Sequence, residues 1–292
     1  MRKLGNTTIE KVEELCAAGF RPNRMFPKFD QAAFDAHKGW MCPDHVDPAN
    51  DRLVGSVHTW IVRTPRHTIL IDTCLGNDKQ RHNPGWNKLD TPFLNRLKAC
   101  GCDPDSVDFV MCTHLHVDHV GWNTKLENGR WVPTFRNAKY LFAKREYAHW
   151  ESERQKQGEG QVNDGSFDDS VLPIVEAGKA VMIESDHQPD PLLTIEDYPG
   201  HTPGSIAINL DDGGRRATFS GDIMHHPIQV YYPDWSSQFC WDQAMSARSR
   251  RKLLEDCVES NALLCPAHFP GANAGHIKPQ GNAFRIDWDV LK

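Results

Sequence analysis

The sequence has no long hydrophobic run. Its first twenty residues, MRKLGNTTIEKVEELCAAGF, contain two early cations but no apolar core of signal-peptide length. No later segment approaches the ~20 consecutive apolar residues that a membrane-spanning helix requires. These absences predict a soluble, cytoplasmic protein that has no membrane partner.

The sequence also lacks an excess of basic charge. Its formal net charge is −6, and the 33 Lys and Arg residues are spread along the chain rather than gathered in one stripe. Binding to nucleic acid or to an anionic membrane depends on concentrated positive charge. The composition therefore argues against a nucleic-acid partner and favours a small-molecule substrate, while a homodimer stays open as a protein partner.

Paired cysteines are missing as well. The nine cysteines are an odd number and include no Cys-x-x-Cys pair. Several of them stand in apolar runs, where a thiol behaves as a small hydrophobic group: Cys74, Cys112, Cys257 and Cys265. A disulfide framework and a cysteine-rich zinc knuckle are therefore not expected.

Hydrophobic patterning indicates one layered domain. With 292 residues and 39% hydrophobic content, the chain can bury a substantial core. Residues 1–50 interleave prolines with phenylalanines and are predicted to form an irregular arm packed on a body that spans residues 51–292. Helices are predicted at 91–101, capped by Thr91 and ended by Gly101, and at 241–260. Short apolar runs predict strands at 56–64, 68–73, 107–113, 139–144, 180–185, 192–198, 205–210, 216–221 and 262–267. Strands with interspersed helices predict an α/β or α+β fold.

The stretch CTHLHVDHVGW, residues 112–122, is rich in metal-ligand side chains. It places three histidines and an aspartate within six residues, directly after a predicted strand, where a rigid sheet can aim loop side chains. Three more ligand-type residues each follow another predicted strand, among Gly or Pro that permit a sharp turn. The seven candidates are His114, His116, Asp118, His119, His201, Asp222 and His268. We expect them to converge at one end of the sheets.

Imidazole and carboxylate groups suit zinc and related divalent ions. His114, His116 and His201 are predicted to hold one ion. Asp118, His119 and His268 are predicted to hold a second, with Asp222 bridging the two. This arrangement is a two-metal hydrolase centre. The expected cofactors are two divalent ions per chain, with Zn²⁺ ahead of Mn²⁺, Fe²⁺ or Co²⁺.

Other notable side chains allow two interpretations each. Asp72 either orients a ligand imidazole or is a turn residue at a strand end. The remaining histidines of interest favour structural or supporting roles: His58, His225, His226 and His276. Five aromatic residues either line an apolar pocket or pack in the core: Trp122, Trp131, Trp150, Phe239 and Trp241.

The His-x-His-x-Asp-His motif, followed in order by GHTPGS, SGD and AHFPG, resembles the metallo-β-lactamase superfamily over residues 55–275. The resemblance implies a four-layer αββα sandwich with a dinuclear metal site between the sheet edges. The C-terminal half is similar to the methyl parathion hydrolase and lactonase-like branch, through GDIMHHPIQVYYPDWSSQFCWD, a basic helix and HFPGANAGHI.

Two departures from related families bear on the substrate. Asp222 stands where β-lactamases with a Cys-type second site carry cysteine, so the chain looks less like an antibiotic-degrading enzyme. The acyl-homoserine lactonases carry a tyrosine three residues beyond the bridging aspartate, where it hydrogen-bonds the substrate carbonyl. His225 occupies that position here and is the candidate for a catalytic role, with Tyr231 or Tyr232 as substitutes through a different geometry.

The resemblance and the ligand set together predict a dinuclear metal-dependent hydrolase that cleaves a neutral ester, lactone or phosphotriester. A metal-bridging hydroxide would attack, and Asp118 would relay a proton to the leaving group. The alternative is a glyoxalase-like thioester hydrolase or an iron-dependent sulfur oxygenase, for which a basic glutathione clamp would be diagnostic. A non-catalytic binding protein is disfavoured by the intact ligand set.

Overall fold

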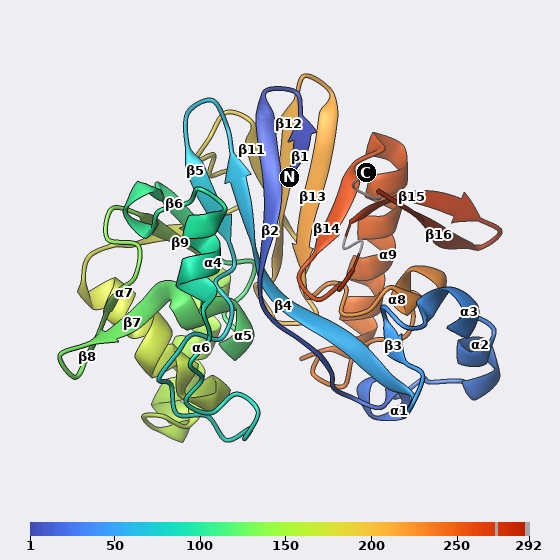
Figure 1. Cartoon of the computed structure of the whole chain (residues 1–292), viewed down its shortest axis with the longest axis horizontal. Helices are drawn as coiled ribbons and strands as arrows, with labels where there is room; N and C mark the ends of the chain where they lie inside the picture. Colours follow the sequence, from blue (N-terminus) through green and yellow to red (C-terminus); the bar gives the residue numbers. More distant parts are fainter. Residues whose placement is uncertain (272–273, 290–292) are drawn as a thin grey trace. The chain divides into compact units, whose positions relative to one another are not determined.

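The computed structural model describes residues 1–271 and 274–289 (Figure 1). The chain divides into two compact units, which are described separately. The first unit contains Met1–Glu14 and Val57–Leu192. The second contains Leu15–Ser56 and Leu193–Lys292.

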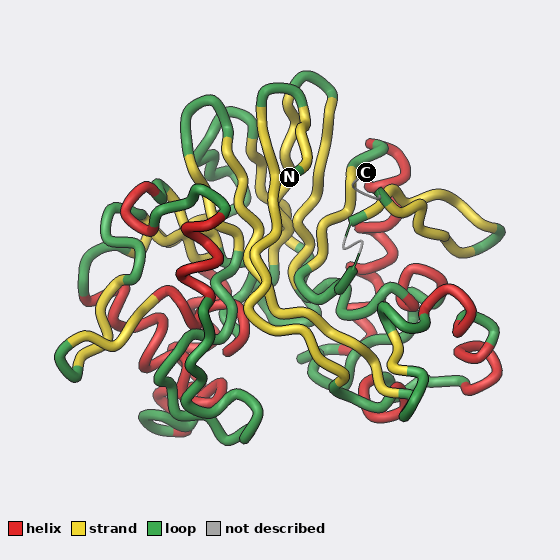
Figure 2. The backbone as a smooth tube through the Cα atoms, viewed as in Figure 1, coloured by secondary structure: helices red, strands yellow, loops and turns green. Residues whose placement is uncertain are grey.

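The larger sheet mixes antiparallel and parallel strands, most of them from the first unit. Its order is β1-β2-β4-β5-β6-β9-β10, with the short β3 paired to β4. Figure 2 shows the long neighbours β2 and β4 side by side. Strands β5, β6, β9 and β10 run parallel, which explains their near-continuous apolar sequences, because parallel strands are commonly covered on both faces. The strands are β1 Arg2–Leu4, β2 Thr7–Ala18, β3 Val46–Asp47, β4 Arg52–Arg63, β5 Thr68–Ile71, β6 Phe109–Met111, β9 Lys139–Ala143 and β10 Ala180–Ile183.

Helices of the first unit pack on this sheet through a buried cluster. Leu70, Val110 and Tyr140 contribute from the strands, and Leu97 and Phe167 contribute from the helices. The helical segments are α4 Phe93–Ala99, η1 Pro104–Ser106, α5 Val117–Val120, η2 Gly121–Asn123, α6 Lys144–Gln157, η3 Val162–Gly165, the π-helical η4 Phe167–Val171 and α7 Leu172–Glu176. A separate hairpin joins β7 Thr124–Glu127 to β8 Arg130–Pro133. Its turn residues Asn128 and Gly129 both have positive φ, as a two-residue hairpin turn requires.

The second unit has a sheet of order β11-β12-β13-β14-β15-β16. Only the β13–β14 pair among these ladders is parallel. The strands are β11 Leu193–Asp197, β12 Ile206–Asp212, β13 Arg215–Gly221, β14 Leu263–Pro266, β15 Gly275–Gln280 and β16 Ala283–Trp288.

The long helix α9, Gln243–Ser260, packs against this second sheet. Its first turn is capped by the Asp242 carboxylate, which accepts a hydrogen bond from the Met245 N–H at 2.9 Å. It ends where Asn261 adopts the left-handed conformation. Leu253 and Leu254 are fully buried against the sheet residues, and burying each contributes roughly 1.5–3 kcal/mol. The shorter helices of this unit are α1 Pro22–Met25, α2 Gln31–Asp35, α3 Lys38–Met41 and α8 Ile228–Tyr231.

Every strand predicted from residue 56 onward is present, but two local predictions are wrong. The helix predicted at 91–101 begins at Phe93 after Pro92, and the Thr91 hydroxyl donates to Glu14 instead of capping it. Residues 1–50 are not irregular, because they contain β1, β2, β3 and three short helices. The buried positions of β2 are Thr7, Ile9, Val12 and Glu14, so its alternation shifts by one residue after Ile9, and its charged residues obscure the pattern further. The domain boundary at residue 50 stays a prediction.

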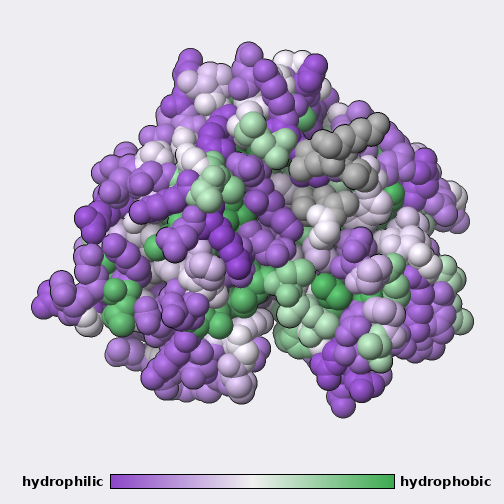
Figure 3. Space-filling view, in the orientation of Figure 1, coloured by the Kyte–Doolittle hydropathy of each residue, from purple (hydrophilic) through white to green (hydrophobic). Residues whose placement is uncertain are grey.

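Figure 3 shows a face that is largely hydrophilic, with limited hydrophobic areas. Within residues 1–271 and 274–289, no helix is long and apolar enough to cross a membrane. Of the HFPGANAGHI segment, Ala272 and Asn273 lie outside the described residues, as do positions 290–292 of the predicted domain.

Candidate metal centre

In the first unit, Asp72 organises the loop that carries the histidine motif. Its carboxylate accepts hydrogen bonds from the Thr113 N–H at 2.7 Å and the Thr113 hydroxyl at 2.8 Å. The same carboxylate lies 2.9 Å from His119 Nδ1, where it accepts a hydrogen bond from the Nδ1–H and leaves Nε2 directed away from Asp72. Asp72 has a φ of 57°, a conformation that is uncommon outside glycine and is often found at functional sites. The structure therefore supports the orienting interpretation of Asp72.

Backbone contacts hold the short helix α5 against the segment that follows Asp72. The Thr73 N–H donates to the His119 carbonyl at 2.7 Å, and the Gly121 N–H donates to the Cys74 carbonyl at 2.7 Å. A Cβ atom at Gly121 would lie 1.8 Å from the Leu75 carbonyl oxygen. Only glycine permits this close approach, which fixes the helix that carries Asp118 and His119.

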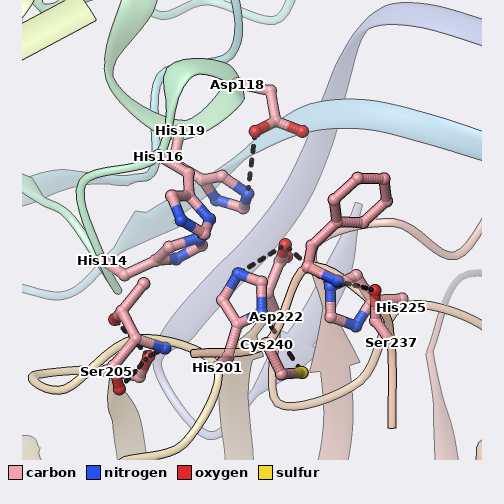
Figure 4. Close-up of polar contacts among 12 residues, drawn as sticks. His114, His116, Asp118, His119, His201, Ser205, Asp222, His225, Ser237 and Cys240 are labelled. Atoms are coloured by element: carbon pink, nitrogen blue, oxygen red, sulfur yellow. Dashed lines mark hydrogen bonds and ion pairs between the residues drawn. The ribbon is translucent and has the colours of Figure 1, made fainter. Parts of the chain in front are cut away.

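The four residues of the motif lie together. His114 Nε2 is 3.1 Å from His116 Nδ1, and His119 Nε2 is 3.7 Å from Asp118 Oδ1 (Figure 4). The rings of His114 and His119 are 4.0 Å apart between centroids. His114 and His119 are buried, whereas His116 and Asp118 are partly exposed. The structure thus brings together the predicted candidates of this unit.

In the second unit, Asp222 lies among three histidines. Its Oδ1 is 2.9 Å from His268 Nε2. Its Oδ2 is 3.4 Å from His201 Nε2 and 3.3 Å from His225 Nε2 (Figure 4). The two carboxylate oxygens therefore face different imidazoles, as a carboxylate that bridges two ions requires.

Neighbouring groups orient two of these rings. His268 Nδ1 lies 2.9 Å from the Ser56 carbonyl oxygen, and His201 Nδ1 lies 3.7 Å from the Cys240 sulfur (Figure 4). These contacts leave the Nε2 atoms on the side of Asp222. Sequence reasoning missed Ser56 and Cys240 because neither stands in a recognisable motif.

The turn that carries His201 is fixed on both sides. The Ser205 hydroxyl lies 2.6 Å from the Thr202 hydroxyl and accepts a hydrogen bond from the Thr202 N–H at 3.0 Å. Before His201, a Cβ atom at Gly200 would lie 2.2 Å from the Ser246 nitrogen of α9. The glycines and prolines of YPGHTPGS therefore permit a close approach of the loop to the helix, as the sequence indicated.

His225 and His226 are neighbours with different surroundings. His225 is buried, with its ring 4.8 Å from that of His201 and 6.0 Å from that of His268. Its Nε2 faces the Asp222 carboxylate at 3.3 Å, and its Nδ1 has no hydrogen-bond partner among the described residues. Burial lowers the pKa of His225, although the nearby Asp222 carboxylate opposes this shift.

His226, in contrast, is satisfied structurally. Its Nε2 lies 2.9 Å from the His45 carbonyl oxygen, and its Nδ1 accepts from the Ile228 N–H at 3.2 Å. Burial lowers its pKa to about 3. The structural interpretation of His226 is therefore confirmed.

The aromatic candidates separate into buried and exposed groups. Trp122 is buried, stacks on Phe93 and donates its indole N–H to Glu14 at 2.6 Å, so it is a packing residue. Phe239 and Trp241 are 45% and 54% exposed. The Trp241 N–H donates to the His201 carbonyl at 2.8 Å, so these two side chains extend from the loop next to a candidate ligand.

Residues 52–269 match the metallo-beta-lactamase superfamily. A relative from Azorhizobium caulinodans, the N-acyl homoserine lactonase AttM, is 31% identical over 197 residues, covering 66% of this chain and 69% of the relative. An N-acyl homoserine lactonase from a Bacillus species is 23% identical over 54% of this chain and 60% of its own length. The lactonases among these relatives agree with the predicted branch.

A solved structure with the same fold is AidC, described as a dizinc quorum-quenching lactonase in complex with a product. It has a TM-score of 0.80 and 17% identity, covering all of this chain and 97% of AidC. The predicted αββα fold is thereby confirmed. With the family match spanning most of its length, the chain belongs to the metallo-beta-lactamase superfamily and is a metal-dependent hydrolase of that fold.

Proposed function

We propose that this enzyme hydrolyses neutral lactones and related esters, a substrate class that extends to phosphotriesters, with two divalent metal ions. The observation that carries the proposal is that each unit gathers His and Asp side chains suited to divalent ions. They are His114, His116, Asp118 and His119 in the first unit, and His201, Asp222 and His268 in the second. The proposal assigns His114, His116 and His201 to one ion, Asp118, His119 and His268 to the other, and Asp222 to both.

The donor chemistry fits zinc or a similar ion. The 3.1 Å separation of the His114 and His116 nitrogens is close to the ~3.3 Å expected for two ligands on one tetrahedral zinc with bonds of ~2.0–2.1 Å. The Asp72 and Ser56 contacts orient His119 and His268 as supporting groups orient metal-bound imidazoles in other proteins. When bound, the ions would supply a low-pKa water and polarise the substrate carbonyl.

Two further residues receive roles in the proposal. Asp118 is partly exposed and lies beside His119, so its carboxylate can carry a proton to the leaving alcohol. His225 has both ring nitrogens within the histidine cluster of the second unit, and it would contact the substrate oxygen. Burial lowers its pKa, which favours the neutral ring, and a neutral imidazole has one nitrogen that can donate.

The substrate class follows from charge and from the relatives. A net charge of −6 suits an uncharged substrate better than an anionic polymer, and the relative that is 31% identical is an N-acyl homoserine lactonase. We further propose that Phe239 and Trp241 contact the apolar part of the substrate, because they are exposed beside the His201 loop. The cytoplasm is the proposed location.

The proposal is tested with purified, metal-loaded protein and a panel of lactones, aryl esters, phosphotriesters, thioesters, a penicillin and RNA. We expect turnover of at least one lactone or aryl ester, no RNA cleavage, and slow or absent penicillin turnover. Faster cleavage of a thioester or RNA than of every neutral oxygen ester would overturn the substrate class. The Asp222→Asn variant, whose turnover should be at least ~10-fold lower, serves as the control for contaminating esterases, because their activity would not fall with it.

A further inference from the structure

The candidate ligands His114 and His116 flank Leu115, whose peptide groups are held by side chains from distant parts of the first unit. The Leu115 N–H donates to Glu146 Oε1 at 3.0 Å. The Leu115 carbonyl accepts from the Asn163 side-chain amide. The Asn163 amide oxygen also accepts from the Val117 N–H at 3.2 Å. Two side chains therefore satisfy three polar groups of the backbone that carries the ligands.

Glu146 is fully buried in the first turn of α6. The same Oε1 atom accepts the Trp150 indole N–H at 2.6 Å, and the Trp150 ring stands edge-on to the His116 ring at 5.4 Å. Glu146 thus fixes both the backbone between the two histidines and an aromatic wall against one of them. Burying a carboxylate is costly unless it is hydrogen-bonded. The hydrogen bonds from Leu115 and Trp150 offset this cost and hold Glu146 in one position.

Asn163 adopts a left-handed conformation, with φ of 52°. Asparagine tolerates this region better than other non-glycine residues, and the Ser166 hydroxyl donates to the Asn163 carbonyl at 2.8 Å. The helix α5 has no side-chain cap of its own at His116. Asn163 supplies the missing acceptor to its first residue, Val117, from outside the helix.

From these contacts we propose that Glu146 and Asn163 are positioning residues that set the metal affinity of His114 and His116. They fix the main chain between the two histidines, whose ring nitrogens lie 3.1 Å apart. The proposal rests on the metal centre of the proposed function. Glu146 and Asn163 are not among the seven proposed ligands and would act on the ions only through the backbone of His114 and His116.

The test measures Zn²⁺ affinity by chelator competition, and separately measures the unfolding of the metal-free protein in denaturant. Asn163→Gly keeps the left-handed backbone and removes both side-chain hydrogen bonds, so we expect Zn²⁺ affinity to fall by about 10-fold or more. Glu146→Ala should cause a similar loss. Glu146→Gln, which retains an acceptor for Leu115 and Trp150, should recover part of that affinity.

Matched controls are available in the same unit. Asn128→Gly makes the same substitution at another left-handed asparagine, in the β7–β8 turn. Glu151→Ala removes an exposed glutamate of α6, which accepts a hydrogen bond from the Tyr147 hydroxyl. Neither control should change Zn²⁺ affinity.

Each outcome decides one question. Unchanged Zn²⁺ affinity in Asn163→Gly and Glu146→Ala, together with a lower unfolding free energy, would reduce both residues to structural roles and overturn the inference. If Glu146→Ala fails to fold, Asn163→Gly still carries the test, and wild-type Zn²⁺ affinity in that variant overturns the inference. Wild-type protein that binds no Zn²⁺ or other divalent ion would instead refute the proposed function itself.

Discussion

At the scale of single residues, substitution of Asp222 gives the most direct test of the proposed metal centre. Its two oxygens face different histidines at 2.9 and 3.4 Å. Asp222→Asn keeps the shape but loses the charge, so we expect metal affinity to weaken by about 10- to 100-fold and turnover to fall at least ~10-fold. Metal titration and steady-state kinetics measure both quantities. Asp211→Asn, an exposed carboxylate paired with Arg216, is the control, and an unchanged Asp222→Asn enzyme would remove Asp222 from the centre.

The lowered pKa of His226 predicts how the unfolding free energy depends on pH. Its pKa is about 3 in the folded protein, compared with an ordinary value of 6.5. Between these values the unfolded chain binds a proton that the folded chain does not, so the unfolding free energy falls as the pH is lowered from 6.5 to 3. The slope is about 1.4 kcal/mol per pH unit.

Chemical denaturation of metal-free protein at a series of pH values measures this slope. In His226→Gln the slope should decrease by about one proton's contribution. His187→Gln, in the first unit, is the matched control for the substitution itself. Equal slopes in wild type and His226→Gln would contradict the buried, neutral state of His226.

The candidate metal ligands could be predicted from the sequence because their spacing and their positions after strands are typical of metal sites. His114, His116, Asp118 and His119 stand within six positions, and His201, Asp222 and His268 each follow a strand. Glu146 was not predictable, because in KREYAHWESERQKQ it resembles an ordinary solvent-exposed helix residue. Its burial and its contact with Leu115 depend on how α6 packs, which no local pattern encodes.

At the scale of elements, α9 supports the second unit through Arg250. The guanidinium is fully buried and donates to the Ile223 carbonyl at 2.8 Å, the Pro233 carbonyl at 2.6 Å and the Ser246 hydroxyl at 2.9 Å. Ile223 directly follows Asp222, so the helix is tied to the loop that carries this candidate ligand. Burial lowers the pKa of Arg250 to about 10, which still leaves it charged at neutral pH.

Arg250→Met should therefore lower the unfolding free energy by about 2–5 kcal/mol, because several buried acceptors lose their donor. Denaturant melts of the variant and of Arg248→Met, at an exposed position of the same helix, provide the comparison. A loss no larger than that of Arg248→Met would mean that the buried acceptors find other partners.

The exposed aromatic loop, residues 236–241, makes a prediction about specificity. If Phe239 and Trp241 contact the apolar part of the substrate, Trp241→Ala should raise KM for long-chain acyl lactones by roughly 10-fold, consistent with the ~1–3 kcal/mol that a lost apolar contact is worth. KM for a short-chain lactone should change little. Equal effects on short and long chains would indicate a general disturbance of the His201 loop, to which the Trp241 N–H is bonded.

Elements were predictable where the apolar period was clear and less so where charge interrupts it. Strands β5, β6 and β14 are short apolar runs and were located correctly. β2 was missed because TIEKVEELC carries four charged residues, although Glu14 is buried and accepts the Leu75 N–H at 2.7 Å. Local hydrophobicity does not reveal a buried carboxylate whose partners lie sixty residues away.

At the scale of the whole molecule, the fold could be anticipated because four motifs occur in a set order along the chain. The grouping of Leu15–Ser56 with Leu193–Lys292 could not be anticipated from the sequence, because contacts between residues far apart in the chain produce it. The cluster of Phe26, Phe34 and Met41 with Ile228 and Trp235 is an example. The phenylalanines of the N-terminal segment thus pack with residues about two hundred positions away.

Metal binding should be visible in the stability of the whole molecule. Ions that bind only the folded state stabilise it by about 2.7 kcal/mol per site at a free concentration of 100 times Kd, and the seven proposed ligands provide two such sites. Elemental analysis of protein purified without chelator and then supplied with zinc should approach two ions per chain, and thermal melts should shift upward compared with chelator-treated protein. Saturation at one ion under excess zinc or manganese would contradict the role of Asp222 as a shared ligand, because the remaining residues would then serve a single metal.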